Sequence, residues 1–165
     1  MNLEYTRILP KLIVFDLDYT LWPLWVDTHV KLPIKKTKDG TVVDTFGYEI
    51  NLISILKWLE RKDVKLAVAS RTTEPAVAYE LIKIFEIEDF FHYKEIYPGC
   101  KVKHFKKFAE SSNIPFKEML FFDDEERNIW DINQLGVTCL HVPDGISMAS
   151  FQDGLEIYSD KFDNK

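Results

Sequence analysis

Four groups of reactive side chains each follow a short apolar run in this sequence. Carboxylates come first and last, and a hydroxyl beside a guanidinium and a single amine lie between them. In chain order the groups are Asp16 with Asp18, Ser70 with Arg71, Lys101, and Asp123 with Asp124. Such a set can bind a hard cation through oxygen and also neutralise an anionic substrate. The residue types therefore indicate chemistry on a phosphate group.

The two leading carboxylates suit the hydrolysis of a phosphate monoester. The substrate is a dianion that hydrolyses very slowly unaided, and it repels an attacking carboxylate unless a cation compensates the charge. Mg²⁺ favours one or two carboxylates together with waters and a phosphate oxygen. Asp16 can bind the cation with one oxygen and attack phosphorus with the other. Asp18 points the same way on an extended chain and can protonate the leaving oxygen.

The later groups complete the predicted site. Ser70 can donate a hydrogen bond to a phosphate oxygen, and Lys101 can neutralise the group being transferred. Asp124 completes the metal site, with Asp123 either a second ligand or a support for the ligands. Each group alone has an ordinary explanation, such as a solvated turn or a helix cap. Their order, each at a strand end, predicts a magnesium-dependent phosphatase that forms an aspartyl phosphate on Asp16.

Apolar runs and amphipathic segments alternate along the chain, which predicts an α/β fold with a parallel, Rossmann-like sheet sandwiched by helices. The expected strands are 11–15, 64–69, 91–97, 119–122 and 137–142, and the expected helices are 52–59, 75–85, 102–109, 129–135 and 148–158. Ligands of such sheets bind at the carboxyl ends of the strands. Because the four groups lie there, we expect them to converge in one crevice of a single domain, 1–165.

The interval 22–48 interrupts this alternation. An Asp-Gly pair at 39–40 lies between apolar residues and predicts a β-hairpin. The interval is too short for a separate cap domain, so we expect a capless enzyme with a small flap. Trp22 and Trp25 could form an aromatic wall for the substrate or pack in the core, and His29 could contact the substrate.

The motifs resemble those of the haloacid-dehalogenase superfamily and, within it, the magnesium-dependent phosphatase 1 family. The segments that carry the likeness span most of the chain and are 14–23, 25–29, 69–72, 95–101 and 121–125. The resemblance implies a small capless phosphatase that acts on phosphotyrosine, as a protein phosphatase, or on fructosamine 6-phosphates. The sequence itself does not distinguish these substrates.

The resemblance also implies a role for each matched residue. Asp16 is the nucleophile and Asp18 the acid and base. Asp16, Asp18 and Asp124 are the Mg²⁺ ligands, with Asp18 binding through its backbone carbonyl. The residues implied to bind phosphate or substrate are Leu17, Ser70, Arg71 and Lys101.

Composition narrows the possible partners. The net charge of −6 argues against nucleic acid as a partner. No apolar run is long enough to cross a bilayer, and residues 1–10 do not resemble a secretory signal, so we expect a cytoplasmic protein and no membrane partner. Neither Cys100 nor Cys139 has an arginine six positions later, which argues against a cysteine-based phosphatase. The expected partner is a phosphorylated small molecule or a phosphoprotein.

Two alternatives use related chemistry. A receiver-like signalling module also forms an aspartyl phosphate, but its acidic pair comes on the first strand and its phosphoacceptor on a central one. Here Asp16 and Asp18 come first and Asp123 and Asp124 come late, which favours the phosphatase. A phosphomutase on the same fold needs a site that admits a second phosphosugar and excludes water, usually with a cap.

Overall fold

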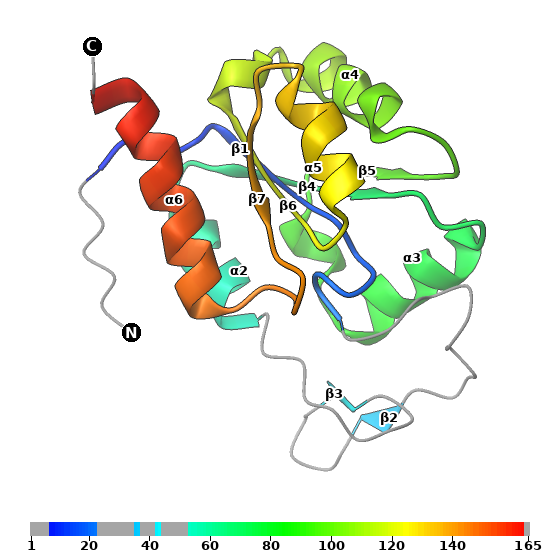
Figure 1. Cartoon of the computed structure of the whole chain (residues 1–165). Coiled ribbons are helices and arrows are strands. Elements are labelled where there is room, and N and C mark those ends of the chain that lie inside the picture. The colour runs from blue at the N-terminus through cyan, green and yellow to red at the C-terminus, as the bar shows by residue number, and fades with distance from the viewer. Residues whose placement is uncertain (1–6, 23–34, 37–41, 44–52, 164–165) are drawn as a thin grey trace.

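The computed structural model of the chain describes residues 7–22, 35–36, 42–43 and 53–163. Its centre is an open five-stranded sheet in the order β5-β4-β1-β6-β7, in which all pairs are parallel (Figure 1). The strands are β1 (Leu12–Phe15), β4 (Lys65–Ser70), β5 (Tyr93–Ile96), β6 (Met119–Asp123) and β7 (Thr138–His141). All five predicted strands are present, and the α/β class is confirmed.

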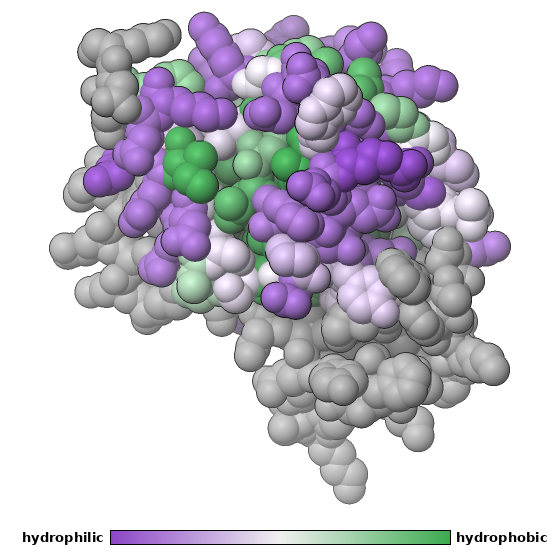
Figure 2. Space-filling model, in the orientation of Figure 1, coloured by the Kyte–Doolittle hydropathy of each residue, from purple (hydrophilic) through white to green (hydrophobic). Residues whose placement is uncertain are grey.

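Helices cover both faces of the sheet, as predicted. One face carries α2 (Ile53–Glu60), α3 (Pro75–Ile84) and α6 (Met148–Asp163), and the other carries α4 (Lys101–Ser112) and α5 (Glu126–Asn133). Two 3₁₀ turns, Glu88–Phe90 and Phe116–Glu118, precede β5 and β6. Figure 2 shows that the surface over α5 and α6 is mainly hydrophilic, with hydrophobic side chains gathered over the edge strand β7.

The central strand β1 is buried on both faces. Ile13 and Phe15 join the core under α2, α3 and α6, whereas Leu12 and Val14 join the core under α4 and α5. This division follows from the period of two along a strand. A strand covered on both sides reads as a continuous apolar run, which is why 12–15 contains no polar residue.

The strand order places the polar groups together. After β1 the chain moves to β4 and β5 on one side, and it later returns to β6 and β7 on the other. Such a reversal leaves a crevice at the carboxyl ends of the neighbouring strands. Phe15 is in register with Val68 and Phe122, and the amide of Asp16 donates to the carbonyl of Phe122 at 3.0 Å. Asp16 therefore lies level with the end of β6.

The predicted hairpin is represented by two short strands. β2 (Lys35–Lys36) and β3 (Val42–Val43) pair antiparallel, with Lys36 opposite Val42. The turn between them, together with Trp25 and His29, lies outside the described residues. Within the described parts of the chain, no helix has both the length and the apolar character needed to cross a membrane.

Candidate active site

A pocket of about 220 Å³ opens at the carboxyl end of the sheet. It brings together side chains from the ends of β1 and β4 and from the beginnings of α4 and α5. Its lining residues are Asp16, Asp18, Ser70, Arg71, Thr72, Lys101, Glu125, Arg127 and Asn128. Five of these are residues that the sequence placed in one crevice, so the expected convergence is present in the structure.

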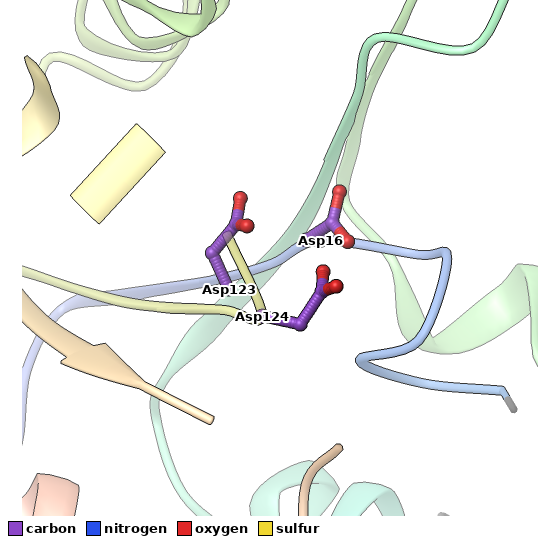
Figure 3. A group of neighbouring side chains, drawn as sticks. All are labelled: Asp16, Asp123 and Asp124. Carbon is purple, nitrogen blue, oxygen red and sulfur yellow. The ribbon is translucent and has the colours of Figure 1, made fainter. Parts of the chain in front are cut away.

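Three carboxylates form a compact group beside this pocket. Oxygens of Asp16, Asp123 and Asp124 lie within 4.8 Å of one another. Figure 3 shows Asp16 just after β1, with Asp123 and Asp124 beside it at the end of β6. Burial raises the pKa of Asp16 well above its ordinary value, and the charge of Asp123 adds to this, while Lys101 opposes it. The group is a concentration of negative charge that a cation would relieve.

Lys101 is the first residue of α4, and its amine lies between two of these carboxylates. Its Nζ donates to Oδ1 of Asp16 and, at 2.5 Å, to Oδ2 of Asp123. The residue is 1% exposed. Burial disfavours the charged amine, but the two carboxylates outweigh burial and raise the pKa of Lys101. Lys101 is therefore a buried ammonium ion held beside Asp16.

Asp123 has donors on both oxygens. Oδ2 accepts from Lys101, and Oδ1 accepts the backbone amide of Glu125 at 2.8 Å. The amide nitrogen of Asn128 donates to Oδ1 at 3.2 Å and to Oδ2 at 3.1 Å. Asp123 is fully buried at the end of β6, just before α5, and the N-terminus of that helix favours a nearby acidic group. Its lone pairs are largely taken by protein donors.

Asp124 is more open and is held by Thr20. The hydroxyl of Thr20 donates to Oδ1 of Asp124 at 3.4 Å and accepts the amide of Asp124 at 3.2 Å. His141, at the end of β7, donates from Nε2 to the carbonyl of Asp124 at 2.8 Å. Burial and the charge of Asp123 raise the pKa of Asp124. The carboxylate of Asp124 is thus partly buried and is held in direction by Thr20.

A tight turn after β1 orients Asp18. The carbonyl of Leu17 accepts the amides of Thr20, Leu21 and Trp22, and Tyr19 adopts a φ of 54°. The side chain of Leu17 is in the core, so only its backbone can face a phosphate. The Asp18 side chain is not part of the three-carboxylate group and instead accepts a hydrogen bond from Trp22.

Ser70 is the last residue of β4, and Arg71 follows it. Ser70 is 2% exposed, and its Oγ accepts the amide of Thr72 at 3.3 Å, so its own hydrogen is directed elsewhere. Arg71 donates from Nη1 to Oδ1 of Asn128 at 3.1 Å. Asn128 therefore links Arg71 to Asp123, because its oxygen faces the guanidinium and its nitrogen faces the carboxylate.

His104 joins the end of β4, at Ser70, to the loop before α4, at Tyr97. It is fully buried in α4, and its Nε2 lies 3.0 Å from the carbonyls of both Ser70 and Tyr97. Carbonyls only accept, so Nε2 carries the hydrogen. The ring also stacks on Tyr97, with centroids 4.1 Å apart. His104 therefore holds the end of β4 against the loop before α4.

Four contributors to this site had no assigned role from the sequence: Thr20, Asn128, His104 and His141. Thr20 lies within the quoted motif, but hydroxyls are frequent in turns and the residue gave no separate signal. Asn128 and His104 lie inside helices, where their side chains could equally face solvent. For Trp22 the sequence left open an aromatic wall for the substrate or packing in the core. Trp22 is 2% exposed and its ring packs on Phe85 in a tilted arrangement, so the structure favours packing.

Comparisons with known proteins identify the family of the chain. A model of the acid phosphatase family matches residues 8–161. Magnesium-dependent phosphatase 1 of Homo sapiens is 48% identical over 155 residues, which cover 92% of this chain and 88% of the human protein. A HAD-like hydrolase superfamily protein of Schizosaccharomyces pombe is 42% identical over 154 residues, covering 84% of this chain and 87% of that protein.

Solved structures share the fold at low sequence identity. The N-terminal part of a Bacteroides fragilis protein, described as containing a phosphatase domain complexed with Mg, has a TM-score of 0.63 and 20% identity, covering 90% of this chain and 39% of that chain. A HAD-superfamily hydrolase of Ehrlichia chaffeensis has a TM-score of 0.61 and 13% identity, covering 93% of this chain and 98% of that chain. The family match favours the phosphatase over the receiver-like alternative. The chain belongs to the acid phosphatase family, within the haloacid-dehalogenase type of hydrolases.

Proposed function

We propose that this protein hydrolyses phosphate monoesters through a covalent aspartyl phosphate on Asp16. The coarser activity, that of a magnesium-dependent phosphatase of the haloacid-dehalogenase type, follows from its relatives. The observation that supports the finer proposal is the placement of Asp16. It is a buried carboxylate that lines the pocket, accepts a hydrogen bond from the ammonium of Lys101 and has an oxygen within 4.8 Å of oxygens of Asp123 and Asp124.

The donor set suits Mg²⁺. Three hard carboxylates lie within 4.8 Å of one another, and carboxylate oxygen is what this ion prefers. Asp16 and Asp124 are the proposed side-chain ligands, with Asp18 contributing its backbone carbonyl. Asp123, whose oxygens already accept from Lys101, the Glu125 amide and Asn128, is proposed to support the site without binding the ion. The bound ion would neutralise the phosphate and lower its repulsion of Asp16.

In the first chemical step an oxygen of Asp16 attacks phosphorus. The bond from phosphorus to the ester oxygen breaks, and its electron pair leaves with that oxygen, which takes a proton from the Asp18 carboxyl. Lys101, the Ser70 hydroxyl and Arg71 stabilise the charge of the transferred group. Burial of Lys101 strengthens this effect because little water screens its charge.

In the second step water attacks the phosphorus of the aspartyl phosphate. The water gives a proton to the Asp18 carboxylate as it bonds, and the electron pair of the broken phosphorus–oxygen bond returns to Asp16. The products are the alcohol and inorganic phosphate, and Asp18 regains the proton that it gave in the first step. One residue therefore serves as acid and then as base.

The proposed substrates are phosphotyrosine and fructosamine 6-phosphates. Arg71 and Arg127 line the pocket beside Glu125, so the rim offers both charges to a polar leaving group. A panel of phosphotyrosine peptides, phosphosugars and fructosamine phosphates, compared by kcat/KM with Mg²⁺ present, distinguishes a phosphoprotein from a small-molecule substrate. Equal values across the panel would count against both assignments.

Asp18→Asn tests the mechanism. With p-nitrophenyl phosphate the first step needs little acid help, so hydrolysis of the intermediate becomes limiting. We expect a burst of p-nitrophenol near one equivalent per enzyme, and acid quenching should recover phosphate bound to Asp16. An alkyl phosphate, whose leaving group is poor, should lose turnover almost completely. Asp16→Asn is the matched control and should give neither turnover nor trapped phosphate.

A contrary result is equally clear. If Asp18→Asn slows both substrates by the same factor and yields neither burst nor trapped phosphate, Asp18 is not the shared acid and base. Trapped phosphate on a residue other than Asp16 would contradict the assignment of the nucleophile.

A further inference from the structure

Trp22 ends the turn after β1 and contacts the proposed acid and base directly. Its indole Nε1 donates a hydrogen bond of 2.8 Å to Oδ1 of Asp18. The backbones of Asp18 and Trp22 also form an isolated bridge, which fixes their separation. An indole N–H can only donate, and hydrogen bonds to an ionised acceptor are stronger than neutral ones.

The core holds the indole ring in place independently of Asp18. Trp22 is 2% exposed and belongs to the core cluster under α2, α3 and α6. Its ring packs on Phe85 with centroids 5.5 Å apart, and the backbone amide of Trp22 donates to the carbonyl of Leu17. Because packing fixes the rotamer, the donor is already aimed before substrate binds, as precise catalytic geometry requires.

We propose that Trp22 is a positioning residue that holds the Asp18 carboxyl in the orientation needed for proton transfer. This inference rests on the proposed acid and base role of Asp18. Oδ1 accepts the indole N–H, so a proton carried by Asp18 is directed to Oδ2. Asp18 lines the pocket. Because one of its oxygens is fixed, the carboxyl group cannot rotate freely, and the proton is not turned away from the substrate.

The test is Trp22→Phe, which keeps an aromatic ring but removes the N–H. kcat/KM reports the steps up to departure of the leaving group. For an alkyl phosphate, which needs the Asp18 proton, we expect kcat/KM to fall roughly 10-fold or more, the effect of losing a hydrogen bond to a charged group. For p-nitrophenyl phosphate it should fall less than about 3-fold, because that leaving group needs little protonation.

Two matched variants separate the hydrogen bond from packing. Phe85→Leu removes the ring contact but keeps the indole N–H, and Trp58→Phe removes a buried indole that packs on Phe151 away from the pocket. Both should change the two substrates by similar factors, whatever they do to thermal stability. An unequal loss in Phe85→Leu as large as in Trp22→Phe would overturn the hydrogen-bond explanation in favour of packing.

Asp18→Asn, measured in parallel, shows which idea fails. If it affects both substrates equally, the acid and base role is wrong and the inference falls with it. If it affects them unequally and Trp22→Phe does not, only the positioning role is overturned.

NMR signals of the indole N–H groups test the hydrogen bond between Trp22 and Asp18 directly. The chain has four tryptophans, and the indole N–H signal that is missing in Trp22→Phe identifies Trp22. In Asp18→Ala this signal should move more than the other three. An unmoved signal would show that the hydrogen bond does not form in solution and would overturn the proposal.

Discussion

At the scale of single residues, the site depends on a buried cation that compensates buried carboxylates. Lys101 contacts Asp16 and Asp123, and all three side chains are at most 10% exposed. A buried ion pair adds little to stability compared with apolar packing, but removal of one partner leaves an uncompensated charge. The amine is therefore needed for the fold to tolerate the carboxylates, as well as for the proposed chemistry.

Lys101→Met should be destabilising as well as inactive. We expect the free energy of unfolding to fall by about 3–5 kcal/mol without added metal, the cost of breaking a buried pair. Urea unfolding measures this. Lys107→Met, which removes an exposed amine paired with Glu110, is the control and should change stability by less than about 1 kcal/mol. Equal effects of the two substitutions would contradict the buried ion group.

Asn128 should be coupled to Arg71 in catalysis. Its amide bridges the guanidinium and Asp123, so Asn128→Ala frees the guanidinium and Arg71→Ala removes the guanidinium itself. In a double-mutant cycle on kcat/KM, Arg71→Ala and Asn128→Ala should show a coupling energy of about 0.5–3 kcal/mol. Additive effects would mean that Asn128 supports Asp123 only and does not position Arg71.

At the scale of elements, α4 contributes more than Lys101. His104, one turn further along, donates to the carbonyls of Ser70 and Tyr97 and so joins the end of β4 to the loop before α4. Burial lowers the pKa of His104, and the positive charge of Lys101 lowers it further. The hydrogen bonds of the His104 ring to backbone carbonyls oppose this shift. A neutral His104 is consequently part of the folded state.

The free energy of unfolding should therefore fall as the pH drops through the range in which histidine takes up a proton. Because the pKa of His104 is lowered in the folded state, the unfolded chain takes up the proton first as the pH falls. The contribution of neutral His104 to stability is therefore full above the ordinary histidine pKa of 6.5 and is lost as the pH falls below it. Between about pH 7.5 and about pH 5.5, the wild type should lose about 1 kcal/mol more of unfolding free energy than His104→Gln. Urea titrations at both pH values test this, and parallel losses would contradict it.

Helix α6 touches the strand that ends in the acidic pair. A Cβ added at Gly154 would lie 2.5 Å from Cζ of Phe122, the residue before Asp123. Because Phe122 is fully buried and stacked on Phe15, it has little room to move. Gly154→Ala should cost about 1–3 kcal/mol, the usual effect of overpacking a core. Thermal unfolding measures it, and a neutral substitution would show that α6 can shift outward.

At the scale of the whole molecule, charge links metal binding to stability. The chain has a net charge of −6, and three of its carboxylates are gathered in one place. Mg²⁺ that binds only the folded protein stabilises it by about 2.7 kcal/mol at 100 times its dissociation constant. We expect the thermal midpoint to rise by roughly 5–10 °C over chelator-treated protein.

The matched variant for this measurement is Asp124→Asn, which should lose most of the rise. Sodium chloride at equal ionic strength should not reproduce it in the wild type. Activity should disappear with chelator and return with Mg²⁺, whereas calcium should bind but support poor turnover because its coordination is larger and looser. Full activity in excess chelator would contradict the metal assignment.

Most of the fold could be predicted from the sequence because local patterns of apolar residues indicate its helices and strands. The run 12–15 is apolar throughout because both its faces are covered, and the helical stripes repeat at the helix period. The rule that ligands bind at strand ends then predicted one crevice for all the polar groups, which are Asp16, Asp18, Ser70, Arg71, Lys101, Asp123 and Asp124. That the chain is a single capless domain stays a prediction, as do the roles of Trp25 and His29, which lie outside the described residues.

By itself, then, the sequence determined the class of fold, the crevice and the kind of chemistry, since these depend on residue type and order along the chain. Only the tertiary structure decided which partner each polar group has. In the structure, Trp22 is hydrogen-bonded to Asp18, and Asn128 to both Asp123 and Arg71. His104 is hydrogen-bonded to the carbonyl of Ser70. These contacts join segments through packing and hydrogen-bond direction, which a one-dimensional pattern does not contain, because a helix or turn residue of the same type can equally face solvent.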